Sequence, residues 1–206
     1  MARKYGQYCG LARALDVVGD RWNLLIVRQL LIGPARYRDL QDGLPGIATN
    51  LLSDRLRDLE AAGVVERRLG EERNAVLYAL TEWGAALREP VEGLIRWSLP
   101  LMITGPGEDV FLPQWLPVAI PAIVYRGGAP AGPEVVGVEI DGQLYQVSAV
   151  DDGVDVRPHD GRDLDAILRG TPEYVLGFAA GLSLDDIRAV TDIEGDEAAL
   201  LKVFRG

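Results

Sequence analysis

Residues 46–80, GIATNLLSDRLRDLEAAGVVERRLGEERNAVLYAL, decide the fold of the first half of this chain. Gly63 lies where a left-handed residue would end a helix. Before it, apolar residues recur at the 3.6-residue period of a helix that packs by one face: Ala48, Leu51, Leu52, Leu56, Leu59 and Ala62. After it, 64–69 and 75–80 are β-branched and apolar enough for two strands joined by a turn. A helix followed directly by a hairpin is the outline of a winged helix.

Two further helical patterns lie upstream, and a short third helix follows Gly33-Pro34. The first two are separated by Gly19-Asp20 and marked by Leu11, Ala12, Leu15 and Val18, then by Trp22, Leu25, Ile26 and Leu30. A three-helix core with a wing results. Such a module places the exposed face of its last core helix in the DNA major groove, where Asn can read adenine and Arg can read guanine.

The exposed face of the 46–63 helix carries that chemistry in Thr49, Asn50, Ser53 and Arg57. Arginines on the flanking elements would meet phosphates, where they position the protein without reading sequence: Arg36, Arg38, Arg67, Arg68 and Arg73. A solvated surface or a protein-binding winged helix fits the same pattern. Charge does not separate these alternatives, because residues 34–73 hold seven arginines against eight acidic residues.

Several features occur in a fixed order between about Tyr8 and about Trp97. They are Cys9 before the first helix, Gly19-Asp20-Arg21-Trp22, Arg36-Tyr37, Leu44-Pro45-Gly46-Ile47, LSDRLRDLEAAGVV and the wing's LYALTEWG. Together they resemble the HxlR family of winged helix-turn-helix transcriptional regulators. The resemblance implies a dimeric regulator of double-stranded operator DNA, more often a repressor than an activator, with terminal helices forming much of the dimer contact.

Carried over by position, the resemblance implies Thr49, Asn50 and Ser53 as base readers. It implies supporting contacts from Arg36, Arg55, Arg57 and Arg68. The chain departs from the family pattern at Ala48, where a small hydroxyl residue is usual. Loss of that cap would cost about 1 kcal/mol unless Thr49 caps instead. The acidic wing tip, Glu71-Glu72, is a second departure and argues against insertion of the wing into the minor groove.

Cys9 is the only cysteine, which excludes an intrachain disulfide and indicates a reducing cytoplasm. One interpretation is a small buried hydrophobe before the first helix. The family resemblance implies the other, a thiol that senses oxidants or electrophiles, sometimes through an intersubunit disulfide. Arg3 and Lys4 could lower its pKa if they reach it.

No catalytic or metal-binding constellation is evident, and we expect neither an enzyme nor a cofactor. His159 is the only histidine, so neither a Cys/His zinc site nor a Ser-His-Asp triad can be assembled in one chain. Asp151-Asp152 and Asp185-Asp186 are better explained as a turn and a helix start. The longest uncharged apolar run, 110–125, contains three prolines, so we expect no transmembrane helix.

We expect two domains, 1–105 and 106–206, divided near the segment ITGPGED. Before the boundary, 81–101 predicts a helix interrupted or restarted at Pro90, whose apolar residues favour a dimer interface over core packing: Leu87, Val91, Leu94, Ile95 and Trp97. Residues 1–105 hold 14 basic and 13 acidic side chains, and residues 106–206 hold 7 and 18. The net charge of −11 in the second part repels DNA phosphates, so the DNA contact belongs to the first.

The second part predicts an α+β fold. A proline-rich apolar segment, 110–125, precedes three strands at 134–140, 143–150 and 153–158, and helices follow. The expected helix starts are Thr171-Pro172, Ser183 and Asp196.

VEIDGQLYQVSAVDDGVDV, LDAILRGTPEYVLGFAAGLSLDDI and the ending DIEGDEAALLKVF make residues 109–206 similar to the sterol-carrier (SCP2-like) fold. The resemblance implies an apolar tunnel between a sheet and its helices. Its candidate lining residues, which ordinary core packing also explains, are Trp115, Leu116, Ile120, Tyr125, Tyr145, Leu168, Phe178, Leu182 and Phe204. Pro113, Pro117 and Pro121 are expected to interrupt the family's first helix.

We therefore expect an α+β chain with an N-terminal winged helix-turn-helix domain and an SCP2-like domain. Its expected function is that of a cytoplasmic, homodimeric transcriptional repressor controlled by an apolar small-molecule effector. Two alternatives stay open: a lipid carrier whose winged helix only dimerises, and a thiol-based redox regulator acting through Cys9.

Overall fold

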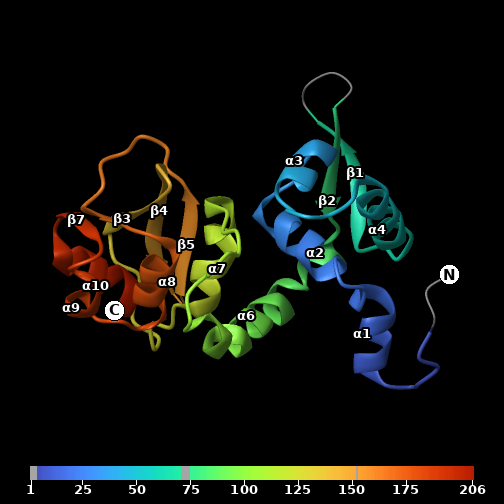
Figure 1. The fold of residues 1–206 in the computed structure, drawn as a ribbon, viewed down its shortest axis with the longest axis horizontal. Helices are drawn as coiled ribbons and strands as arrows, with labels where there is room; N and C mark the ends of the chain where they lie inside the picture. The colour runs from blue at the N-terminus through green and yellow to red at the C-terminus, as the bar shows by residue number, and fades with distance from the viewer. Residues whose placement is uncertain (1–3, 71–74, 152) are drawn as a thin grey trace. The chain divides into compact units, whose positions relative to one another are not determined.

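The computed structural model of the chain describes residues 4–70, 75–151 and 153–206 (Figure 1). The chain divides into two compact units, Met1–Val91 and Glu92–Gly206. Within the described residues, no helix is both long enough and apolar enough to cross a membrane.

The first unit is a winged helix, with the helices and the hairpin in the predicted order (Figure 1). Its strands pair antiparallel from Val65 opposite Leu80 to Leu69 opposite Val76, and a bridge from Ala35 to Tyr78 extends the hairpin. The elements are α1 (Gly10–Val18), α2 (Asn23–Ile32), α3 (Tyr37–Asp42), α4 (Thr49–Ala61), β1 (Val65–Leu69), β2 (Val76–Leu80) and α5 (Glu82–Ala85).

Helix α4 buries Leu52, Leu56 and Leu59 as its periodicity predicts. It ends at Gly63, whose φ of 77° is the predicted left-handed conformation. The Val64 N–H donates to the Leu59 carbonyl at 2.9 Å, and the Gly63 N–H donates to the Glu60 carbonyl at 3.0 Å. These two bonds form a Schellman motif, which satisfies carbonyls that the helix end would leave unpaired.

The start of α4 carries no side-chain cap among the described residues. Ala48 occupies the capping position and Thr49 is the first helical residue, so Thr49 does not replace the missing cap. The predicted wing tip, Glu71-Glu72, and Arg73 lie outside the described residues.

Helix α6 (Arg88–Met102) restarts after α5 with Pro90 in its first turn, as predicted. A first-turn proline is tolerated because its missing N–H would have no partner within the helix. The elements after α6 are the 3₁₀ turn η1 (Pro113–Trp115), α7 (Leu116–Ile123), β3 (Val135–Ile140), β4 (Gln143–Val150), β5 (Gly153–Pro158), β6 (Ala166–Arg169), α8 (Pro172–Ala180), α9 (Leu184–Ile187), β7 (Asp192–Gly195) and α10 (Glu197–Arg205).

The five strands form one sheet in the order β5-β4-β3-β6-β7. All neighbours pair antiparallel except β3 and β6, which run parallel. The three predicted strands are confirmed to within one residue. Asp141 and Gly142, at φ 51° and 72°, join β3 to β4 in a two-residue hairpin turn whose positive φ angles match the strand twist.

Helices α7, α8 and α10 pack against strands of this sheet and complete an α+β unit (Figure 1). The expectation that prolines would interrupt the helix before the sheet is wrong for Pro117 and Pro121, which both lie within α7. Pro117 is in the first turn, where no N–H is needed. Pro121 forfeits one backbone bond, and the burial of Leu116, Val118, Ile120 and Ala122 by the same helix offsets that cost.

The three predicted helix starts in this unit are confirmed in position. Asp196 accepts a hydrogen bond from the Ala198 N–H at 2.9 Å, and Ser183 forms a reciprocal capping box with Asp186. Thr171 occupies the capping position of α8, but the structure gives it no side-chain capping bond.

Candidate nucleic-acid interface

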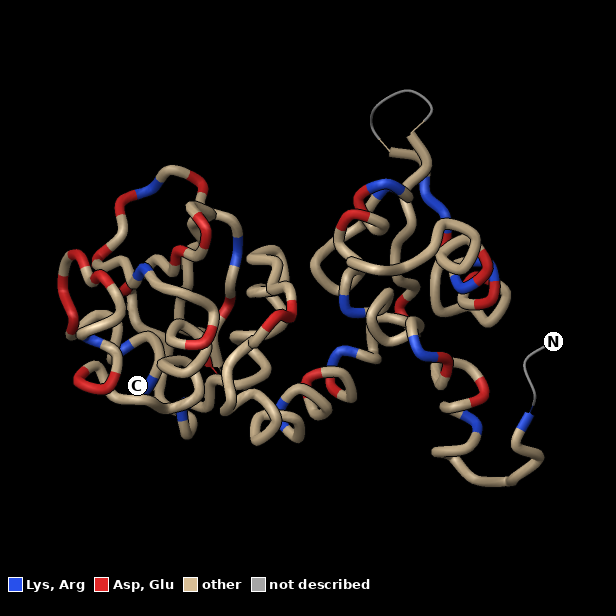
Figure 2. The backbone as a smooth tube through the Cα atoms, in the orientation of Figure 1, with Lys and Arg blue, Asp and Glu red and all other residues tan. Residues whose placement is uncertain are grey.

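Helix α4 presents a polar face that combines small and charged side chains. Thr49, Asn50 and Arg57 are exposed, and Ser53 is half-buried one turn along the same helix. Figure 2 shows acidic and basic residues interleaved along α4. The predicted base readers therefore share one helix.

Arg57 and Arg68, two of the predicted supporting arginines, are paired with carboxylates. Arg57 contacts Asp54 at 3.0 Å, and Arg68 contacts Glu66 at 2.6 Å. Such exposed pairs contribute little stability. The remaining flanking arginines are Arg36 and the exposed Arg38 at the start of α3, and Arg67 on β1, which reaches Glu60 at 3.1 Å.

Arg55 differs from the other arginines of α4. Its side chain is only 22% exposed and pairs with Asp20, between α1 and α2, and with Asp58 at 3.1 Å. Arg55 therefore links α4 to the turn before α2.

Tyr37 is a functional candidate that the sequence pattern does not reveal. From the first residue of α3, its hydroxyl donates to the Thr49 carbonyl at 2.6 Å and accepts from the Ser53 hydroxyl at 3.1 Å. The sequence showed Tyr37 only as part of the opening of a helix. The contacts of Tyr37 with Thr49 and Ser53 depend on how α3 packs on α4, and the spacing of residues along the sequence does not specify that packing.

Cys9 is exposed at the capping position of α1, so the interpretation of Cys9 as a buried hydrophobe is wrong. The structure gives the Cys9 side chain no capping hydrogen bond. The backbone N–H groups of Ala12 and, to a lesser extent, Leu11 nevertheless lower the pKa of the Cys9 thiol below its ordinary value. Lys4 is not among the causes of this shift, and Arg3 lies outside the described residues.

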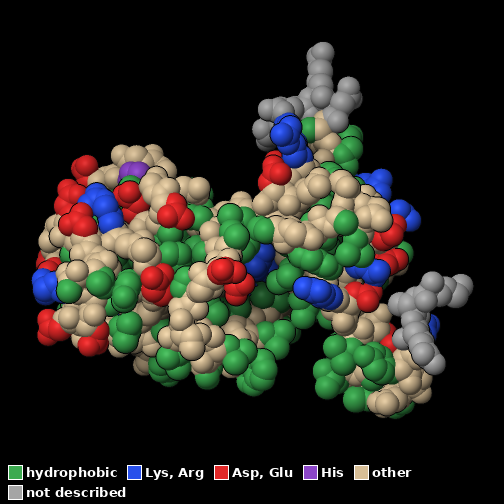
Figure 3. Space-filling model, viewed as in Figure 1, with side chains coloured by type: hydrophobic (Ala, Val, Ile, Leu, Met, Phe, Trp, Pro, Cys, Tyr) green, Lys and Arg blue, Asp and Glu red, His purple; other side chains and the backbone are tan. Residues whose placement is uncertain are grey.

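Two stretches of the chain expose large apolar side chains. One comprises α1 and the residues before it, with Tyr5, Tyr8, Leu11 and Leu15. The other is α6 and its end, where Val91 is buried but Leu94, Trp97, Leu101, Met102 and Ile103 are exposed. Figure 3 shows hydrophobic side chains gathered on the surface over α1. Apolar surface of this kind marks interaction sites.

Most of the predicted tunnel lining is packed core. Six of the nine residues lie in one buried cluster: Leu116, Ile120, Tyr145, Leu168, Phe178 and Phe204. The rings of Phe178 and Phe204 pack edge to face with centroids 5.1 Å apart, and burial raises the pKa of Tyr145. Trp115 is half-buried against Phe111, whereas Tyr125 is 84% exposed and does not join the core.

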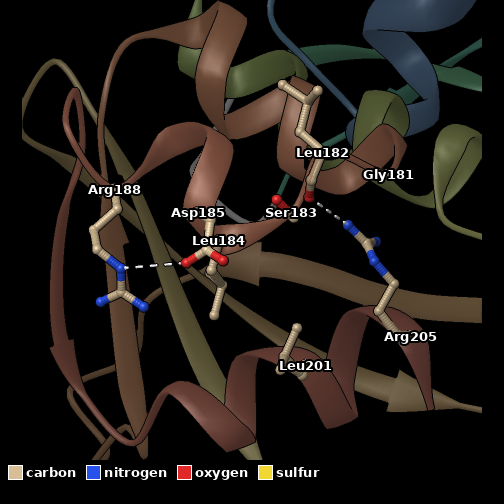
Figure 4. Close-up of a pocket in the computed structure, with 8 residues that line it drawn as sticks. All are labelled: Gly181, Leu182, Ser183, Leu184, Asp185, Arg188, Leu201 and Arg205. Carbon is tan, nitrogen blue, oxygen red and sulfur yellow. Dashed lines mark hydrogen bonds and ion pairs between the residues drawn. The ribbon is translucent and has the colours of Figure 1, made fainter.

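Leu182, the remaining candidate, lines an open pocket of about 430 Å³ (Figure 4). The pocket lies between the α8–α9 connection and α10, and its walls are Gly181, Leu182, Ser183, Leu184, Asp185, Arg188, Leu201 and Arg205. Its two cations are already engaged. Arg188 pairs with Glu197 at 2.6 Å, and Arg205 donates to the Leu182 carbonyl at 3.2 Å and lies 4.8 Å from the Phe178 ring centroid. Leucine side chains supply the apolar surface.

The part of the chain that the structure describes contains no group of three or more His, Cys, Asp or Glu residues placed to hold a metal ion.

Residues 17–102 match the HxlR-like helix-turn-helix family. The HTH-type transcriptional regulator YodB of Bacillus subtilis (strain 168) is 37% identical over 86 residues, which are 41% of this chain and 77% of YodB. The uncharacterised HTH-type transcriptional regulator YvaP of the same organism is 37% identical over 87 residues, 42% of this chain and 81% of YvaP.

Solved structures match a similar share of the chain. The reduced form of YodB covers 48% of this chain and 99% of its own, with 33% identity and a TM-score of 0.42. The match to the redox regulator HypR in its oxidised form covers 44% of this chain and 94% of the HypR chain, with 31% identity and a TM-score of 0.41. Given its 37% identity over most of the length of YodB, together with a helix-turn-helix and wing in the matched region, the chain belongs to the HxlR-like helix-turn-helix family of transcriptional regulators.

Proposed function

We propose that the chain is a non-enzymatic, cytoplasmic repressor that binds double-stranded operator DNA as a homodimer and is released by an apolar effector. The observation that carries the DNA-binding part is the exposed face of α4, with Thr49 and Asn50 at its start, in a chain of this family. Asn can form two hydrogen bonds with adenine in the major groove, and a hydroxyl can contact either kind of base.

Arginines on either side of that face would hold the phosphates. Arg36, at the capping position of α3, and Arg38, on α3, precede α4, and Arg67 and Arg68 follow it on β1. When these arginines neutralise phosphates, the DNA releases its counterions, so affinity falls steeply with salt.

Fluorescence anisotropy on DNA from upstream of the chain's own gene, against shuffled DNA of equal length at two salt concentrations, tests this proposal. A preference of roughly a thousandfold or more for the upstream DNA is expected of a sequence-specific regulator. Weak, equal binding that disappears with salt would refute sequence-specific recognition there.

The exposed apolar residues of α1 and α6 support a homodimer, because a soluble chain rarely leaves such residues unpaired with a partner surface. Light scattering coupled to size exclusion should report twice the chain mass. Trp97→Asp, which places a charge among the exposed apolar residues of α6, should shift the protein toward monomer. Trp83→Asp is the matched control, since Trp83 is also exposed but lies on α5. A monomeric wild-type chain would contradict the proposed dimer.

The effector part rests on the resemblance of 109–206 to sterol-carrier domains. Its support is a closing strand, Gly195-Asp196 and a final helix in the expected order, together with the leucine-lined pocket. A fluorescent fatty acyl probe should bind the wild-type chain and bind Leu182→Asp less tightly. An effector regulates only if it binds the free and the DNA-bound protein with different affinity, so equal affinities would exclude this coupling.

A second function, thiol-based redox sensing, is favoured by the exposed Cys9 thiol with its lowered pKa. Similar proteins include HypR, which is described as a redox regulator. They also include YodB, for which quinone-bound and diamide-treated structures are solved. Diamide should abolish operator binding by the wild-type chain and leave Cys9→Ser unaffected. Equal sensitivity of the two proteins would exclude sensing through Cys9.

A further inference from the structure

The hydroxyl of Tyr37 joins two points on the exposed end of the recognition helix. Its oxygen lies 2.6 Å from the Thr49 carbonyl oxygen and 3.1 Å from the Ser53 hydroxyl oxygen. Thr49 and Ser53 are one helical turn apart on α4, and Tyr37 reaches them from α3.

The protons in this chain of bonds can be counted. A carbonyl oxygen has no proton to give, so the short contact to Thr49 requires the Tyr37 hydroxyl to donate its single proton there. The Tyr37 oxygen can then only accept from Ser53. Ser53 also has a single hydroxyl proton, and this contact uses it. What remains on the Ser53 oxygen is its two lone pairs, which can only accept hydrogen bonds.

We propose that Tyr37 is a specificity-determining residue, which fixes Ser53 as a reader that accepts hydrogen bonds but cannot donate them. The proposal rests on the proposed function, in which α4 lies in the major groove. There, adenine N6 and cytosine N4 are donors, whereas guanine O6 and N7 and thymine O4 are acceptors. The base that faces Ser53 is therefore adenine or cytosine on the contacted strand, and guanine or thymine is disfavoured.

A purely structural role for Tyr37 predicts a different result. Since Ala48 provides no side-chain cap, the bond from Tyr37 also holds the first turn of α4 against α3. Loss of that support alone would weaken binding to every DNA sequence by a similar factor. If Tyr37 instead fixes the Ser53 hydroxyl as an acceptor, loss of the Tyr37 hydroxyl changes the base preference only at the DNA position that faces Ser53.

The test is selection of bound sequences from a randomised DNA library by the full-length chain and three variants. Tyr37→Phe keeps the ring and removes the hydroxyl, and Ser53→Ala removes the reader. Tyr78→Phe is the matched control, because it removes a tyrosine hydroxyl from β2, outside this network. Thermal melting of each variant reports whether the fold is retained.

The wild-type chain should select adenine or cytosine over guanine or thymine, by roughly fivefold for one hydrogen bond, at the position that Ser53→Ala makes indifferent. Tyr37→Phe should lose that preference or reverse it at the same position, and Tyr78→Phe should keep it.

Two results overturn the proposal while leaving sequence-specific binding intact. The first is a wild-type preference for guanine or thymine at the position set by Ser53. The second is an unchanged preference in a folded Tyr37→Phe. Comparison of the wild-type chain with Ser53→Ala identifies the base preferred at the position that faces Ser53, even if Tyr37→Phe does not fold. A wild-type chain that selects no sequence at all would instead overturn the proposed function.

Discussion

The backbone of Gly84 runs against the strand that begins the wing. A Cβ atom at this position would lie 2.0 Å from the Val64 carbonyl oxygen, a distance that no side chain can accept without movement of the backbone. Gly84→Ala should therefore lower the free energy of unfolding by about 1–3 kcal/mol, as overpacking does. Urea unfolding measures it.

Gly93→Ala is the matched control, because Gly93 also lies in a helix and, apart from its chain neighbours and the nearby backbone of that helix, no described atom comes within 4 Å of the place that a Cβ would occupy there. Relief of glycine's entropic cost there should raise stability by about 0.5–1 kcal/mol. Equal destabilisation by both changes would contradict the close approach at Gly84.

The lowered pKa of Cys9 makes a prediction for its reactivity. The thiolate is the nucleophile, and a lowered pKa preserves it to lower pH in the folded chain than in the unfolded chain. The rate of alkylation by iodoacetamide should therefore reach half its maximum at lower pH in the native protein than in urea. Coincident pH profiles would show that the first turn of α1 does not act on the thiol.

At the residue scale, exposure could be predicted where a helical period fixed it and not where it depended on packing. Leu52, Leu56 and Leu59 are buried as their spacing requires. Tyr125 is a large aromatic residue expected inside, yet it follows the end of α7 and is exposed. The partners of Tyr37 and Arg55 come from other elements, so only the folded chain reveals them.

Among the helices of the second unit, α8 and α10 offer a direct test of capping. Asp196 accepts from the backbone of α10, whereas Thr171 holds the same position on α8 without a side-chain capping bond. Asp196→Ala should cost about 1 kcal/mol of unfolding free energy, and Thr171→Ala should cost much less. A larger loss from the Thr171 change, measured by denaturant unfolding, would contradict these capping assignments.

Most of the winged helix could be predicted element by element, because its longer helices carry their own apolar periods and the short α3 follows the Gly33-Pro34 turn. Three strands of the sheet were equally clear, since alternation and Asp-Gly turns are local signals. Strand β6 has four residues and pairs parallel with β3, so its place depends on a long crossover. In α7 the proline signal was misleading, because the buried apolar side chains of that helix outweigh one lost backbone bond.

For the whole molecule, the unequal charge of the two parts has a measurable consequence. The net charge of −11 on residues 106–206 opposes the approach of DNA phosphates. Removal of these residues should strengthen binding to non-specific DNA at low salt, and the difference should shrink as salt rises. It should also abolish binding of the acyl probe, while a redox response through Cys9 would persist. Unchanged low-salt affinity would show that the second part does not influence DNA binding electrostatically.

Recognition by the exposed face of α4 is tested by the ratio of affinities for upstream and shuffled DNA, compared among the wild-type chain, Asn50→Ala and Arg38→Gln. Asn50→Ala should lose about 1–3 kcal/mol on the upstream DNA alone, so its ratio falls. Arg38→Gln should weaken both complexes equally and keep the ratio, since a phosphate contact carries no sequence information. An unchanged ratio in a folded Asn50→Ala would contradict recognition by the exposed face of α4.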